Sequence, residues 1–315
     1  MSRYFIKRII LLLPTLLAIL LAVFVLLNIT NPRGFNSFGI HSLGYEEGTL
    51  DLLDKAFDSA KAGPTLINKY LRYCYNLLIH GEFGTSDSIF DVNYEIFFRL
   101  RVSLVLAGFG FLISLLVGIP LGVSSALKGG SRTDRIISTG TLVAASIPSY
   151  TLAVIVMVIF TVKLRWLPLS GLSSWQSYIM PIMVIASAGI ALTVKMTRSA
   201  VLDVINRQYI TVLHAKGLSE KDIIFKHILK NSFVTIASTL NNLAAQLLCG
   251  TLIAENFFAF PGIGQLVFRS VSQGQQYVLL GTVAVLSVLL MSFNIFFDLV
   301  CGLISPQIRA EYSRK

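Results

Sequence analysis

Residues 9–28 read IILLLPTLLAILLAVFVLLN, a run of apolar residues that carries no charge. A helix needs about 20 such residues to cross the roughly 30 Å hydrocarbon core of a bilayer. Arg3, Lys7 and Arg8 precede the run, as they would in a secretory signal peptide. The apolar core is too long for a signal peptide, however, and no small-residue cleavage site follows it. We therefore expect a retained membrane helix.

Five further apolar stretches of this length follow, at roughly 102–127, 136–163, 178–198, 234–257 and 277–303. The chain has 315 residues, of which 54% are hydrophobic and 13% charged, whereas an ordinary soluble domain has about 25% charged residues. Mean hydropathy is +0.73. The sequence predicts an all-α polytopic membrane protein with about six transmembrane helices.

The basic residues gather at alternate ends of these stretches. Cytoplasmic loops carry an excess of Lys and Arg, and such residues occupy the N-terminal tip, the turn KGGSRTDR (128–135), the loop 195–233 and the C-terminal tail. Residues 29–95 instead hold nine of the sixteen acidic residues (Glu46, Glu47, Asp51, Asp54, Asp58, Glu82, Asp87, Asp91 and Glu95). We expect both termini in the cytoplasm of a cell-membrane protein. This placement explains the net charge of +10 without a nucleic-acid partner.

These assignments divide the chain into four parts. The N-terminal tip and first helix take residues 1–28, an extracytoplasmic segment 29–98, a five-helix core 99–305 and a cytoplasmic tail 306–315. Within the core, residues 206–233 form a cytoplasmic loop. Two interpretations of segment 29–98 stay open: a small lid or docking surface, or a loop packed on the outer ends of the spans.

The chain lacks the common motifs of enzymes. It has no GxxxxGK[ST] phosphate loop, no HExxH and no GxSxG. Cys74, Cys249 and Cys301 lie far apart and indicate neither a zinc site nor a disulfide framework. We therefore predict no catalytic, cofactor-binding or metal-binding residue in this chain. An intramembrane enzyme would have to rely on Glu255 and Asp298.

Polar residues within the spans form the first candidate site. Asn241, Asn242 and Gln246 lie at helical spacing in span five, and Glu255 and Asp298 lie near span ends. Polar groups at membrane depth are costly and often mark a pathway. The amides could instead join neighbouring helices, and the two carboxylates could instead reach water at the interface.

The second candidate site is a charged island, HAKGLSEKDIIFKHILKN (214–231), between two long apolar stretches. We expect two short helices joined at Gly217, which suits a left-handed cap, with Ser219 and Asp222 capping the second helix. That helix carries an apolar stripe of Ile224, Phe225, Ile228, Leu229 and Phe233. Such an element fits a partner's groove or an anionic lipid surface, and the residues alone favour neither.

The order RQYITVLHAKGLSEKDIIFKHILKNSF (207–233) closely resembles the cytoplasmic coupling loop of ABC importer permeases, specifically the peptide and nickel branch. Further landmarks of that branch follow along nearly the whole chain: RYFIKRIILLLPTLL, HGEFGTS, RLRVSLVLA, SIPSY, WLPLSG, ENFFAFPGIGQL and ISPQIR. Three features depart from the branch. Residues 211–213 read Thr-Val-Leu where the family has Glu-Ala-Ala, Phe260 replaces a common Trp, and NITNPRGFN replaces a GDP-like element.

The resemblance implies a non-catalytic permease subunit of an ATP-driven importer. Its implied partners are a second homologous permease, two ABC ATPases that use ATP and Mg, an extracytoplasmic solute-binding protein, and membrane lipid. Peptides are the first implied cargo, and nickel or a metal chelate is the alternative. An ion-driven secondary transporter is a remote rival. The implied ATPase-coupling residues are Thr211, His214, Ala215, Lys216, Gly217, Leu218, Ser219, Asp222, Ile224, Phe225, Ile228 and Leu229.

Overall fold

A computed structural model of the chain describes residues 2–30, 66–83, 92–169, 171–172 and 174–304. The predictions for residues 31–65, which include most of the acidic segment, and for the tail 305–315 lie outside these ranges. Among the described residues all regular structure is helical, which confirms the predicted fold class.

Among the described residues, five helices are long and apolar enough to cross a membrane, and they account for five of the six predicted spans. They are α1 (Ser2–Thr30), α5 (Val92–Leu127), α8 (Ile179–Ile205), α11 (Lys230–Phe257) and α13 (Gln276–Ile304). A short 3₁₀ turn, η4 (Trp175–Tyr178), leads into α8. Several of these helices extend beyond the apolar stretches, because a helix continues into the interface where polar side chains reach water.

The third predicted span, 136–163, is not one straight helix. It consists of α6 (Arg132–Ser146) and α7 (Ser149–Met157), the latter continued by η3 (Val158–Lys163), with a bend of 95° between the two parts. The break lies at Ile147 and Pro148. Ile147 is extended, with ψ 119°, because the ring of the following proline disfavours helical backbone in the preceding residue. Proline therefore splits this span in the middle.

The packing of α5 on α8 shows how many times the chain crosses. A Cβ added at Gly118 would lie 2.6 Å from Thr193 Cβ, and one added at Gly122 would lie 2.6 Å from Thr197 Cβ. A step of four residues along α5, from Gly118 to Gly122, matches a step of four residues in the same direction along α8, from Thr193 to Thr197. The two helices therefore run parallel. Two parallel spans require an odd number of crossings between them, and α6 with α7 supplies the one available. The bent pair therefore counts as one span, which gives six.

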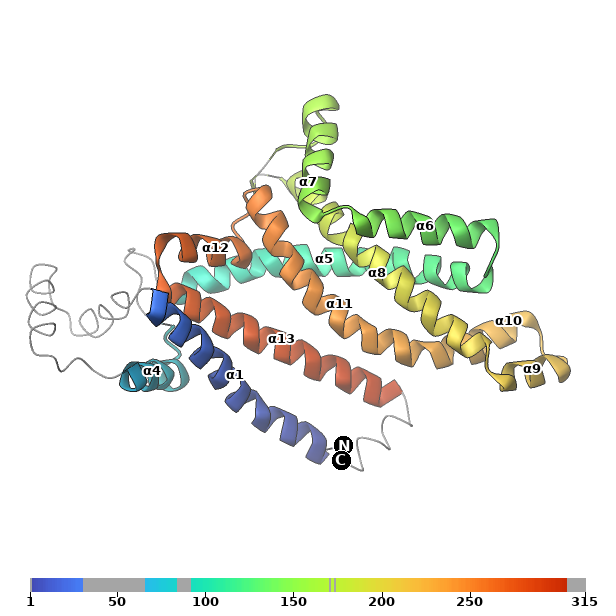
Figure 1. Cartoon of the computed structure of the whole chain (residues 1–315), viewed down its shortest axis with the longest axis horizontal. Helices are drawn as coiled ribbons and strands as arrows, with labels where there is room; N and C mark the ends of the chain where they lie inside the picture. Colours follow the sequence, from blue (N-terminus) through green and yellow to red (C-terminus); the bar gives the residue numbers. More distant parts are fainter. Residues whose placement is uncertain (1, 31–65, 84–91, 170, 173, 305–315) are drawn as a thin grey trace, which may run out of the picture. The chain divides into compact units, whose positions relative to one another are not determined.

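The described residues form two compact units. One unit contains residues 102–260 and 292–304 with the N-terminal tip, and its main core gathers α5, α7, α8 and α11 around Leu106, Met180, Val184, Leu247 and Phe260. Figure 1 shows α8 and α11 lying alongside each other within it, and these two helices share an extensive antiparallel contact.

The other unit contains the described residues of the range 6–101, namely 6–30, 66–83 and 92–101, together with 261–291. It packs α1, the first turns of α5 and α13 with α4 (Leu66–Tyr75), η2 (Asn76–His80) and the short helix α12 (Ile263–Gln273). Tyr70 donates a hydrogen bond to the Leu17 carbonyl at 2.6 Å, and Arg99 joins Glu95 to Gln265. Residues 66–80 thus pack on α1 and α13 rather than forming a separate body.

Candidate functional site

The charged island folds as two short helices around a left-handed glycine. α9 (Gln208–Ala215) ends before Gly217, whose φ is +75°, and α10 (Glu220–Asp222) follows. The Ser219 hydroxyl oxygen accepts a hydrogen bond from the backbone N–H of Asp222. The same hydroxyl group donates a hydrogen bond to the Asp222 carboxylate. The positive φ and the Ser219 cap are confirmed. Figure 1 shows α9 and α10 beyond the ends of α8 and α11.

The second helix of the island is not separate from the fifth span. Residues 220–257 form one continuous helix through α10, the π-helical segment η5 (Ile223–Leu229) and α11. The expected boundary near residue 233 is therefore wrong: no glycine or proline interrupts residues 220–249, so nothing ends the helix there.

A polar side-chain contact joins the two short helices, and further contacts stabilise each helix separately. The Nε2 atom of His214 lies 3.0 Å from Glu220 Oε1, and its Nδ1 atom lies 2.9 Å from the Ile210 carbonyl oxygen. Both partners are acceptors, so both bonds form together only when each ring nitrogen carries a proton. Lys226 adds a contact of 2.6 Å to Asp222. The island is a defined element rather than a loose loop.

Most of the predicted apolar stripe faces the chain itself. Ile228 is 4% exposed, and Ile224 and Leu229 are partly buried in a cluster that also holds Ala126, Val201, Val204, Ile210 and Ile223. The resemblance implies that Ile224, Ile228 and Leu229 couple to the ATPases, but these three side chains pack inside the chain, so any such role is indirect. The ends of α5 and α8 contact this part of the stripe and bury it within the chain.

The outward face of the island has a different composition. Phe225 is 68% exposed, Val212 is 52% exposed and Phe233, the last residue of the stripe, is 40% exposed, so these large apolar side chains lie at the surface. Around them lie the exposed residues Thr211, His214, Ala215, Lys216, Ser219, Glu220, Lys221 and Lys226. Leu218 is half-buried in the inner cluster. We call the exposed set the outer face of the island. Sequence reasoning missed Val212, although its place in α9 opposite the buried Ile210 could have indicated it.

An ion pair with a buried carboxylate and a partly exposed guanidinium anchors the inner side of this region. Asp134, in the first turn of α6, is 5% exposed and receives Arg198 Nε at 2.8 Å and Nη2 at 2.9 Å. The hydroxyl groups of Ser125 and Ser138 and the Gly130 N–H also donate to this carboxylate. The sequence alone does not predict the pairing of Asp134 with Arg198, because the two residues lie 64 positions apart in the chain.

The structure does not gather the five predicted pathway residues into one site. Asn241 donates to Asn294 of α13, which matches the interhelical alternative. Glu255 is fully buried and accepts from the Ser103 hydroxyl at 2.6 Å, so it does not reach water. Asp298 is partly buried on α13. Asn242 and Gln246 are exposed on α11, and both remain candidates for the pathway.

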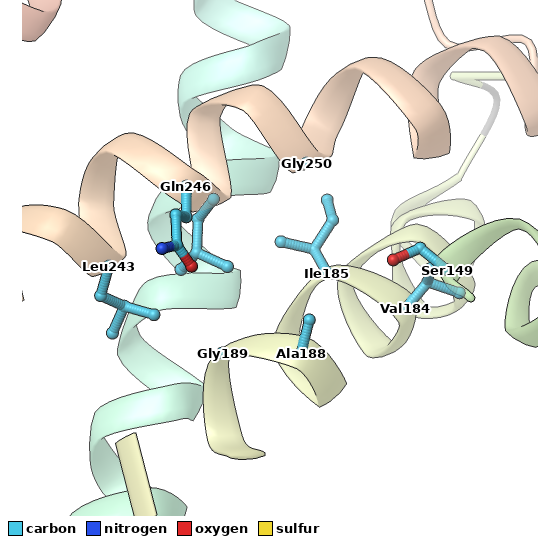
Figure 2. Close-up of a pocket in the computed structure, with 9 residues that line it drawn as sticks. Ser149, Val184, Ile185, Ala188, Gly189, Leu243, Gln246 and Gly250 are labelled. Atoms are coloured by element: carbon cyan, nitrogen blue, oxygen red, sulfur yellow. The ribbon is translucent and has the colours of Figure 1, made fainter. Parts of the chain in front are cut away.

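Gln246 lines a cavity of about 140 Å³ between α7, α8 and α11. Figure 2 shows its amide and the Ser149 hydroxyl on either side of Ile185. The other lining residues are Val184, Ala188, Gly189, Leu243, Leu247 and Gly250. Ser149 belongs to the SIPSY motif, which by itself does not predict a cavity. Elsewhere, no three His, Cys, Asp or Glu side chains within the described ranges are grouped so as to hold a metal ion.

Comparisons with known proteins cover both candidate sites. The model of the family described as binding-protein-dependent transport system inner membrane component matches residues 118–310. The chain is 30% identical over 318 residues to the dipeptide transport system permease protein DppB of Bacillus subtilis (strain 168), with 98% of each chain covered. It is 29% identical over 312 residues to the glutathione transport system permease protein GsiC of Salmonella paratyphi A, covering 98% of this chain and 99% of the relative.

A solved structure shares the fold. A chain of the MetNI methionine ABC transporter in an inward-facing conformation superposes with a TM-score of 0.59 at 16% identity. The match covers 70% of the present chain and 100% of the MetNI chain.

Proposed function

This chain belongs to the family of binding-protein-dependent transport system inner membrane components and is a permease subunit of an ABC importer, and from that premise we propose that it carries short peptides across the cell membrane. The observation that supports peptide cargo is the similarity, over 98% of the chain, to permeases named for a dipeptide and for glutathione, which is itself a small peptide. Nickel or a metal chelate is the less supported alternative.

The proposed assembly contains a second homologous permease, two ATPase subunits and an extracytoplasmic binding protein. A chain without a phosphate loop needs separate subunits to bind ATP and Mg. The outer face of the island would receive those ATPases, with Phe225 and Val212 as apolar anchors amid charged residues. Buried apolar anchors with a polar rim are typical of protein interfaces.

Movement of the ATPases would enter the membrane through the island. Its inner cluster joins the island to α5 and α8, and Asp134 with Arg198 joins α6 to α8. Packed elements of this kind move as rigid bodies between alternative arrangements. In the proposed cycle, this movement would switch the access of the pathway, with Asn242 and Gln246 on its wall.

Reconstitution tests the proposal. The complete complex in liposomes, supplied with its binding protein, should accumulate labelled dipeptides when ATP is present and not when a non-hydrolysable analogue replaces it. The permease chain alone should neither hydrolyse ATP nor accumulate peptide. Uptake by the chain alone, or uptake by the complex of nickel but not of peptides, would contradict the proposal.

A further inference from the structure

The cavity beside Gln246 has the size of a single side chain. Its volume of about 140 Å³ is close to that of an engineered protein cavity of about 150 Å³ that binds benzene. Of the nine described residues that line it, none carries a charge, and seven are apolar or glycine. Such a lining suits an uncharged apolar group.

The apolar stretches of the sequence place the cavity near mid-depth in the membrane. Ser149, Ala188 and Gln246 fall near the centres of the predicted spans 136–163, 178–198 and 234–257 respectively. Three spans therefore contribute their middle residues to one cavity. In secondary transporters, a different class, cargo sites lie near the bilayer midplane beside helices that are broken there. The 95° break before Ser149 is such a place.

Two polar groups accompany the apolar lining. Gln246 contributes an amide that both donates and accepts hydrogen bonds, and Ser149 contributes a hydroxyl. Gln246 and Ala188 are exposed on the surface of the chain, so the cavity opens outward. An amide facing lipid at this depth would be costly. A hydrocarbon tail is therefore a poor occupant, whereas a peptide offers both an apolar side chain and hydrogen-bonding backbone.

We propose that this cavity holds one apolar side chain of the cargo peptide during transport, with the Gln246 amide and the Ser149 hydroxyl hydrogen-bonded to the adjoining peptide bond. The inference rests on the proposed function and adds a specificity site within this permease. The cavity would favour peptides with a side chain up to about the size of leucine or phenylalanine. It would contribute little to the transport of diglycine.

Gly250→Leu provides the test, because a Cβ added at Gly250 meets no atom within 4 Å and the leucine would fill the cavity. Gly108→Leu is the matched control, since Gly108 is also helical and open to an added Cβ but lies outside the cavity. The complete complex in liposomes would be assayed with Phe-Phe, Leu-Leu and Gly-Gly in parallel. Filling an apolar pocket should lower uptake of the first two at least about tenfold. Gly-Gly uptake should stay within about twofold of wild type.

A photoreactive dipeptide that contains photo-leucine, whose diazirine side chain is about the size of leucine, supplies a direct readout. It should label residues 184–189 or 243–250 in the wild-type complex and in Gly108→Leu, and not in Gly250→Leu. Selective loss of large peptides together with loss of labelling would support the inference. Equal loss for all three peptides with a weakened second permease would overturn it, because the cavity would then hold a side chain of that permease. Unchanged selectivity would also overturn it. Failure of the wild-type complex to import any peptide would reject the cargo assignment itself.

Discussion

Asp134 and Arg198 form a two-point ion pair in which Arg198 Nε lies 2.8 Å from Oδ1 and Nη2 lies 2.9 Å from Oδ2 of Asp134. The pair joins α6 to α8, and Ser125 of α5 donates to the same carboxylate. Val201 and Val204, within two turns of Arg198 on α8, belong to the cluster that supports the island. The ends of three helices and the island are thus held by one connected set of contacts.

Removing the carboxylate should therefore destabilise the chain. Asp134→Ala leaves the Arg198 guanidinium without its acceptor. Breaking a fully buried pair costs about 3–5 kcal/mol, and the loss expected here is smaller because the Arg198 side chain is 34% exposed. The thermal midpoint of the purified complex would measure it. Asp203 is an exposed acid on α8, the helix that carries Arg198, and Asp203→Ala should change stability by less than about 0.5 kcal/mol. Equal midpoints for the two variants would contradict the anchoring role.

Gly217 tests whether the shape of the island matters for coupling. Its φ of +75° is strained for a β-branched residue, so Gly217→Val should cost roughly 1–3 kcal/mol locally and turn α9 away from α10. Because an added Cβ meets no atom within 4 Å, the effect would come from backbone strain and not from a clash. Gly217→Asn is the control, since asparagine tolerates this conformation. We expect the valine variant to lose ATPase co-purification and the asparagine variant to keep it; loss in both would implicate something other than φ.

Substitutions at Phe225 and Ile228 distinguish the role of the outer face of the island from that of its inner cluster. Phe225→Asp should leave the fold intact and reduce binding of the ATPases, because its side chain is 68% exposed. Ile228→Asp should instead destabilise the island, because it would bury a charge at a site that is 4% exposed. Pull-down of the ATPases alongside peptide uptake gives the comparison. If the island rests only on lipid, the ATPases would co-purify undiminished with Phe225→Asp and uptake would continue.

The sequence predicted features that depend on local chemistry. Twenty apolar residues must span a bilayer wherever they occur, and a glycine between two capped helices suits only a few backbone conformations. For that reason the spans and the turn at Gly217 were predictable, and the structure confirms both.

Features that depend on distant contacts were not predictable. The stripe at Ile224, Ile228 and Leu229 has the same periodicity whether it faces a partner or its own chain. Only the position of Ala126 and Val201 decides between these alternatives. Likewise, Pro148 in a span could produce a mild kink or a sharp break. The 95° bend depends on how α6 and α7 pack on α8.

The six-span arrangement predicts that both termini are cytoplasmic, and accessibility of single cysteines tests this. In a chain whose three native cysteines are replaced by alanine, Ser59→Cys should react with a membrane-impermeant maleimide in intact cells. Ser219→Cys should react only after the membrane is opened, although its side chain is exposed. Three predicted spans lie between these two positions, so they should lie on opposite sides of the membrane. Labelling of both positions from the same side would contradict the six-span arrangement.

The last prediction concerns Gln246 and Asn241, which are five residues apart on α11 but have different surroundings. Asn241 is bonded to Asn294, so Asn241→Leu should lower stability by about 1 kcal/mol, the typical value of one interhelical hydrogen bond in a membrane. Gln246 lines the cavity, and Gln246→Leu should leave stability and co-purification of the second permease unchanged while peptide uptake falls. Asn242→Leu should also reduce uptake if Asn242 lies on the pathway. Uptake at fixed complex concentration, measured beside the thermal midpoint, distinguishes these effects. Normal uptake by both Gln246→Leu and Asn242→Leu would remove these amides from the pathway and leave them a structural role.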